Sequence, residues 1–241
     1  GVSSAVLKNR IPPNLRHPDG LWFGLSKRGR IIAYNKSRGL PEDIENYEDL
    51  SNESLKGQVC MRSSSNIYNL SLMASLIEAN GADKAESWAK GVTSNFARDP
   101  QGNDTAQLRA VSAGECGITV ANTYYIGRLM GSDKEDDKKT IDGLGFVFPN
   151  QEGRGAHVNI SGGGVVRYAP NKENAVRFLE YLTEESSQKI FSEGNNEYPV
   201  VGQVSGPVAS LGPFKEDSVN ASLFGERQRE AVMVYDRAGW R

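Results

Sequence analysis

Short apolar runs rich in β-branched residues alternate with helical patterns along the 241 residues of this chain. The clearest run, residues 116–121, ends in Ile-Thr-Val-Ala after an early glycine and predicts a buried strand. Similar runs at 31–34, 59–61 and 145–149 predict further strands. Because strands that alternate with helices usually form layered folds, the pattern favours an α/β fold with largely parallel sheets.

A helix is expected directly after the run at 59–61. Apolar residues recur at helical spacing from 70 to 77, Ser64 or Ser65 can cap the start, and Gly81 can end the helix.

Two further helices are predicted downstream. Asn103 and Asp104 are expected to cap a helix that runs to Ala113. Residues 175–190 carry one apolar stripe, which predicts a single long helix that ends at Gly194.

Tyrosines lie at two of the predicted strand-to-helix junctions. Tyr124 and Tyr125 follow the clearest strand, and Tyr68 lies in the first turn of the helix expected before Gly81. In open α/β sheets, ligands bind at the carboxyl ends of strands, where the next helix begins with unpaired N–H groups and a positive dipole end. That environment favours a phenolate over a phenol, and Arg128, on the same helical face as the pair, adds a positive charge.

Three converging phenolates would neutralise a trivalent cation. Fe(III) is the natural candidate, because it is a hard ion that suits anionic oxygen, whereas zinc prefers Cys or His and calcium prefers carboxylates and carbonyls. The adjacent pair alone is weak support, since nine tyrosines in 241 residues would place two side by side in roughly one sequence of three. The hypothesis therefore depends on Tyr68 joining Tyr124 and Tyr125.

Several motifs around these tyrosines make the chain resemble the periplasmic ferric-iron-binding proteins of bacterial iron(III) ABC importers, especially the cyanobacterial type with several tyrosine ligands. The resemblance covers nearly the whole chain, and its motifs are 11–16, 19–26, 67–70, 100–104, the tyrosine pair, 148–151 and 157–162. It implies that Tyr68, Tyr124 and Tyr125 are iron ligands. It also implies that Arg28 and Arg128 balance the phenolate charge, although the charged run around Arg28 by itself reads as a solvated turn.

The resemblance further implies a two-lobed type II periplasmic binding protein fold, with mostly parallel sheets and strands that cross between the lobes. Residues 1–51 and 147–198 would form the amino-terminal-type lobe, and 52–146 with 199–241 the carboxy-terminal-type lobe that carries the tyrosines. The chain opens where the family pattern is already some tens of residues into its first lobe, so that lobe is expected to be incomplete and to lack a further ligand-bearing segment. Hinge closure on the ligand is the expected motion.

The function implied by the resemblance is that of a non-enzymatic periplasmic receptor, a monomer that captures Fe(III) and delivers it to an inner-membrane ABC permease. One alternative is the same scaffold holding an anion or a small organic solute, with the tyrosines as hydrogen-bond donors. A remote alternative is a DNA strand-transfer enzyme with a tyrosine nucleophile. Such enzymes need a His-hydrophobe-His motif, whereas His17 and His157 stand far apart in the sequence.

Charge and hydropathy limit the kinds of partner that this chain is expected to have. The net charge is −2, and no Lys- and Arg-rich block or nucleic-acid reader motif is present, so nucleic acid is not an expected partner. No apolar run approaches the 18 residues or so that indicate a membrane-spanning helix, and the protein is not expected to be transmembrane.

The two cysteines, Cys60 and Cys116, fall in the predicted strands that precede the tyrosines. If those strands are neighbours, the two thiols can form a disulfide in an oxidising periplasm; otherwise both are small buried hydrophobic residues. Two thiols without paired Cys-x-x-Cys or His spacing do not make a zinc site.

Overall fold

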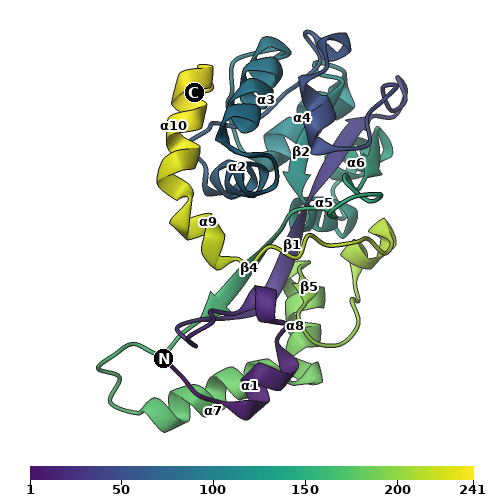
Figure 1. Cartoon of the computed structure of the whole chain (residues 1–241). Helices are drawn as coiled ribbons and strands as arrows, with labels where there is room; N and C mark the ends of the chain where they lie inside the picture. Colours follow the sequence, from purple (N-terminus) through teal and green to yellow (C-terminus); the bar gives the residue numbers. More distant parts are fainter.

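The structure, a computed structural model, describes residues 1–241 and consists of two bodies joined by long strands (Figure 1). The upper body in that view holds most of the helices, and the lower body contains the amino terminus of the chain. The strands are β1 (Phe23–Asn35), β2 (Ile118–Asn122), β3 (Leu144–Val147), β4 (Val158–Gly163) and β5 (Tyr198–Pro199). The α-helices are α1 (Ala5–Arg10), α2 (Ile67–Asn80), α3 (Ala82–Ser94), α4 (Asp104–Ala113), α5 (Thr123–Met130), α6 (Glu135–Asp142), α7 (Lys172–Leu182), α8 (Glu185–Asn195), α9 (Ser222–Glu226) and α10 (Gln228–Ala238). Short 3-10 helices span Pro13–Leu15, Tyr47–Ser51, Glu53–Leu55 and Pro207–Leu211.

Strand β1 organises the sheet, because it runs from the lower body into the upper one and pairs with each of the other four strands (Figure 1). All four pairings are antiparallel, so the expectation of mostly parallel sheets is wrong for these strands. Parallel register occurs at isolated bridges, such as Val59 with Ile118. Hydrophobic patterning reports which residues are buried and does not encode strand direction, which is why the sequence misled on this point.

The predicted run at 116–121 is confirmed as β2, but the run at 59–61 makes only a bridge at Val59. The structure joins Cys60 and Cys116 in a disulfide whose Cα atoms lie 5.9 Å apart, within the usual range for such bonds. Both cysteines are fully buried in the core cluster that packs β1 and β2 against α4 and α5.

Helix α2 matches its prediction except at the cap. Asn66, rather than Ser64 or Ser65, accepts the hydrogen bond from the backbone N–H of Tyr68 at 2.9 Å. Gly81 ends the helix as expected, with a φ of 83° that glycine adopts without steric cost. Asn103 likewise caps α4 as predicted.

The single long helix expected over residues 175–190 is instead two helices, α7 and α8, with a break at Thr183 and Glu184. Gly194 lies inside α8, and Asn196 ends that helix in the left-handed conformation. The buried side chain of Gln188 spans the break, because it donates to the carbonyls of Leu25 and Leu182 and so bonds the end of α7 to the start of α8.

Buried apolar residues form two large clusters in the upper body and a smaller one in the lower body. The first packs α2, α3 and α10 together, with Trp88 and Trp240 in contact. None of the helices is both long enough and apolar enough to cross a lipid bilayer.

Candidate metal centre

Two helix starts place the three tyrosines. Asn66 caps α2 and thereby fixes Tyr68 in its first turn. Strand β2 ends at Asn122, and α5 begins at the next residue, so Tyr124 and Tyr125 occupy the first turn of α5. The predicted junctions are therefore present, and the structure brings residues from the two helices into one cluster.

The three hydroxyl groups meet at one point. The hydroxyl of Tyr124 donates to that of Tyr68 at 2.7 Å, and the Tyr68 and Tyr125 oxygens lie 3.5 Å apart. The rings of Tyr124 and Tyr125 stack with centroids 4.4 Å apart, while the ring of Tyr68 stands edge-on to both at 6.4 Å. The cluster thus presents three oxygen atoms close enough to bind a single small ion.

The environments of the phenols differ. Burial raises the pKa of Tyr124 well above its ordinary value of 10, and burial also raises the pKa of Tyr68. Burial would raise the pKa of Tyr125 too, but the neighbouring hydroxyls of Tyr124 and Tyr68 lower it below its ordinary value, with help from Arg62. The hydrogen bonds within the cluster therefore favour the ionised form of Tyr125.

The two arginines expected near the tyrosines differ in placement. The guanidinium of Arg128 lies 5.1 Å from the ring centroid of Tyr124 and 5.6 Å from that of Tyr125, in cation–π geometry. Arg28 instead donates to Ser161 at 2.7 Å and makes no hydrogen bond with a tyrosine. It lines a cavity of about 340 Å³ that is also lined by Ile67, the neighbour of Tyr68.

The charged run around Arg28 is not a solvated turn, because it forms the middle of β1. Arg30 in this run is almost fully buried and forms an ion pair with buried Asp104 at 2.9 Å. Asp104 also pairs with Arg62 at 3.0 Å, and Arg62 lies 5.0 Å from the ring centroid of Tyr68. Arg30 and Arg62 were not predicted as part of the site. In the sequence, an arginine that is buried in an ion pair cannot be distinguished from one that is exposed to solvent.

The donor set suits a hard, highly charged cation. Phenol oxygens surround the meeting point, and no group of three or more His, Cys, Asp or Glu side chains is arranged to hold a metal ion. Arg62, which lies 5.0 Å from the ring centroid of Tyr68, favours the ionised form of Tyr125, whereas buried Asp104 opposes it.

Neither histidine joins the cluster. His157 is buried and its Nε2 lies 3.1 Å from the hydroxyl of Ser71, so the ring has a hydrogen-bond partner within the core. His17 accepts a hydrogen bond from the backbone N–H of Asp19 and packs edge-on against Trp22.

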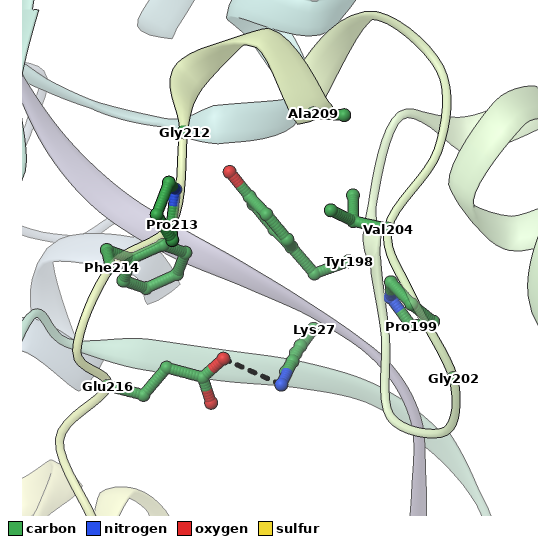
Figure 2. Close-up of a pocket in the computed structure, with 10 residues that line it drawn as sticks. All are labelled: Lys27, Tyr198, Pro199, Gly202, Val204, Ala209, Gly212, Pro213, Phe214 and Glu216. Carbon is green, nitrogen blue, oxygen red and sulfur yellow. Dashed lines mark ion pairs between the residues drawn. The ribbon is translucent and has the colours of Figure 1, made fainter.

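A separate cavity of about 380 Å³ lies beside β5 (Figure 2). Tyr198 and Phe214 form much of its wall, and Lys27 and Glu216 point toward each other across it with a 2.6 Å ion pair. Since those two charges already neutralise each other, this cavity offers no free charged group for an ion.

Comparison with known proteins identifies the family. A family model described as bacterial extracellular solute-binding protein matches residues 4–215. The chain belongs to this family. The structural neighbours of this bacterial extracellular solute-binding protein share its type II periplasmic binding protein fold, so the two-lobed α/β class predicted from the sequence is confirmed.

Among curated relatives, this family member is 50% identical over 242 residues to iron uptake protein A1 of Synechocystis sp., which covers 100% of this chain and 67% of the relative. Among solved structures it resembles Trichodesmium FutA (IdiA), described as in complex with iron and citrate ligands. That match has 55% identity and a TM-score of 0.97, and covers 100% of this chain and 77% of the other. A ferric binding protein from Campylobacter jejuni matches at 42% identity and a TM-score of 0.92, with the same coverage of both chains.

Proposed function

We propose that this chain captures ferric iron through the phenolate oxygens of Tyr68, Tyr124 and Tyr125 and delivers it to an ABC permease of the inner membrane. The observation that carries the proposal is the convergence of three phenol oxygens, separated by 2.7 and 3.5 Å, from the first turns of two helices. Three phenolates supply three negative charges, which match Fe(III) and exceed the charge of a divalent ion.

The relatives support the same cargo. Iron uptake protein A1 and the Trichodesmium structure with iron and citrate are the proteins to which this chain is similar at 50% and 55% identity. A more distant relative at 29% identity is named an Fe(3+)-binding periplasmic protein from Serratia marcescens, which supports the periplasm as the compartment.

The proposed mechanism is ligand exchange followed by hinge closure. In this scheme residues 147–198 and the start of the chain form the amino-terminal-type lobe, while Ile44, Tyr47 and Leu50 pack with α2, α3 and α10, so the segment after β1 belongs with the tyrosine-bearing lobe rather than with residues 1–51 as a whole. Arg28 lies on β1, outside the tyrosine cluster, and lines a cavity together with Ile67 and Ser71 of α2. Closure would bring its charge nearer the phenolates, and the reduced access of water would strengthen the electrostatic attraction between iron and oxygen. The receptor acts as a monomer and binds its cargo without transforming it.

The test is the visible absorption spectrum of the purified chain titrated with ferric citrate. Iron-phenolate coordination is expected to give a red to purple charge-transfer band, which Tyr125→Phe and Tyr68→Phe each diminish. Tyr34→Phe is a matched control, because Tyr34 lies on β1 and takes no part in the cluster. A colourless sample that binds citrate or phosphate without iron would contradict the proposal and favour an anion or small organic solute as the ligand.

A further inference from the structure

One buried carboxylate connects both halves of the tyrosine cluster. Asp104 occupies the first position of α4 and is fully buried. Its Oδ1 accepts a hydrogen bond from Arg62 at 3.0 Å, and its Oδ2 accepts one from Arg30 at 2.9 Å. Oδ2 also accepts from the backbone N–H of Asn122 at 2.7 Å. Hydrogen bonds between ionised groups are roughly twice as strong as neutral ones, so this carboxylate is held firmly.

The hydrogen bond from the backbone of Asn122 to Asp104 fixes the start of α5, the helix that carries Tyr124 and Tyr125. Asn122 is the last residue of β2 and the cap of α5, so its position decides where Tyr124 and Tyr125 begin. Arg30 holds the same residue a second time, because it donates to Asn122 Oδ1 at 3.0 Å. The carboxylate and its arginine thus hold both the backbone and the side chain of this residue.

Arg30 and Arg62, the two arginines that pair with Asp104, also contact the helix that carries Tyr68. Arg30 donates to Asn69 Oδ1 at 2.9 Å, and Asn69 directly follows Tyr68 in α2. Arg62, fixed by Asp104, lies 5.0 Å from the ring centroid of Tyr68. Its own backbone carbonyl accepts from Asn69 Nδ2 at 3.0 Å, which closes the connection between the arginine and the helix.

We infer that Asp104 is a positioning residue for metal capture, which holds the first turns of α2 and α5 at the separation that lets their phenol oxygens meet. The inference rests on the proposed function. Asp104 makes no hydrogen bond with a tyrosine hydroxyl, and it acts through Asn122, Arg30 and Arg62. Loss of its carboxylate would remove the hydrogen bond to the Asn122 backbone and leave two arginines without their shared counter-charge.

If Asp104 acted only through its charge, Asp104→Asn would change the affinity for Fe(III) in one direction; if it acts by positioning the helices, the change has the opposite direction. A carboxylate near phenols opposes their ionisation, so an effect through charge alone would make the neutral variant bind Fe(III) more tightly. Positioning predicts weaker binding, because the two helix starts lose their common anchor. Partners that orient metal ligands typically contribute a factor of about 10 to 100 in affinity, and a loss of that size is expected.

The test is a ferric citrate titration of the whole chain, followed by the charge-transfer band, for the parent and Asp104→Asn. Asp137→Asn is the matched control, since Asp137 pairs with Arg109 at 2.6 Å on α6 and contacts none of the tyrosines. The control is expected to keep the parent affinity. Parent-like or tighter binding by Asp104→Asn would overturn the inference, as would a loss no larger than the unfolded fraction measured by circular dichroism.

A second variant, Arg62→Lys, keeps the test decisive if Asp104→Asn does not fold. Lysine preserves the charge but not the planar fork, and Arg62 is partly exposed, so the fold should tolerate the change. Positioning predicts weaker capture by Arg62→Lys, and parent-like capture would contradict it. Tyr125→Phe in the same titration separates the two proposals: if it diminishes the band while Asp104→Asn and Arg62→Lys leave the band and the affinity unchanged, only the positioning role fails.

Discussion

Gly127 on the tyrosine-bearing helix α5 lies directly against Asn196, the residue that ends α8. A Cβ atom at Gly127 would sit 2.7 Å from the Cβ of Asn196, closer than real Cβ contacts come. Asn196 holds a φ of 58°, so its backbone has little freedom to retreat. Because α5 belongs to the upper body and α8 to the lower one, this contact connects the tyrosine helix to the other half of the molecule (Figure 1).

Gly127→Ala is therefore expected to destabilise the chain and weaken iron capture. Overpacking of this kind costs about 1–3 kcal/mol, and the displaced helix carries Tyr124 and Tyr125. Gly194→Ala is the control, since Gly194 lies in α8 with nothing within 4 Å of its added Cβ. It should stabilise the chain by about 0.5–1 kcal/mol. Urea unfolding and ferric citrate titration measure both effects, and parent-like behaviour of Gly127→Ala would show that α5 and α8 are not tightly coupled.

Iron capture is expected to weaken as the pH falls, because each phenol must release its proton to bind the metal. The sign follows from competition: protons and Fe(III) bind the same oxygens, so acid favours the free protein. Burial raises the pKa of Tyr124, and its proton is therefore displaced by the metal rather than lost beforehand. Tyr124→Phe should reduce the slope of log affinity against pH by about one proton. Competition with a chelator of known protonation between pH 8 and pH 6 measures the slope, and an unchanged slope would exclude Tyr124 as a ligand.

The tyrosine cluster could be predicted from the sequence, whereas the buried charged residues that hold it in place could not. Tyr68 and the pair could be placed because strand-to-helix junctions have local signals, and the ends of two such junctions meet in the structure. Arg30, Arg62 and Asp104 could not, because nothing local distinguishes a buried ion pair from solvated charges. Their burial depends on β1, α4 and the segment around Arg62 coming together over long separations in the chain.

In the fold, too, features with local sequence signals were predicted and features that depend on long-range contacts were not. Helices α2 and α4 were predicted with their ends to within a few residues, since caps and glycine stops are local. The direction of strand pairing and the break between α7 and α8 were not. The buried amide of Gln188 spans the break and bonds to Leu25, far away in sequence, and an apolar stripe does not indicate such a contact.

The disulfide between Cys60 and Cys116 is expected to contribute about 2–4 kcal/mol to the free energy of unfolding, because it closes a loop between residues 56 apart in sequence. The double variant Cys60→Ala with Cys116→Ala should lose that amount. Urea unfolding of the parent with and without a thiol reductant, in denaturant, should reproduce the loss. The double variant is its own control, since reductant should not affect it, and equal stability of parent and variant would show that the bond adds nothing.

His157 should make the fold acid-sensitive. Burial, aided by the charges of Arg30, Arg154 and Arg28, lowers the pKa of this imidazole from 6.5 to about 3. Well above pH 6.5 the ring is neutral in both states and its titration has no effect. Between pH 6.5 and 3 the unfolded chain binds a proton that the folded chain does not, so stability falls by up to about 1.4 kcal/mol per pH unit.

His157→Gln isolates this contribution, because the carboxylates that also titrate in acid are common to both proteins. Glutamine loses the ring's packing against Phe224 and its hydrogen bond with Ser71, so the variant is expected to be less stable at pH 7. Its free energy of unfolding should nevertheless fall less steeply than the parent's from pH 6 to pH 4, by a difference approaching one proton. Urea unfolding at several pH values measures both slopes. Parallel curves would mean that His157 binds its proton in the folded protein as easily as in the unfolded one.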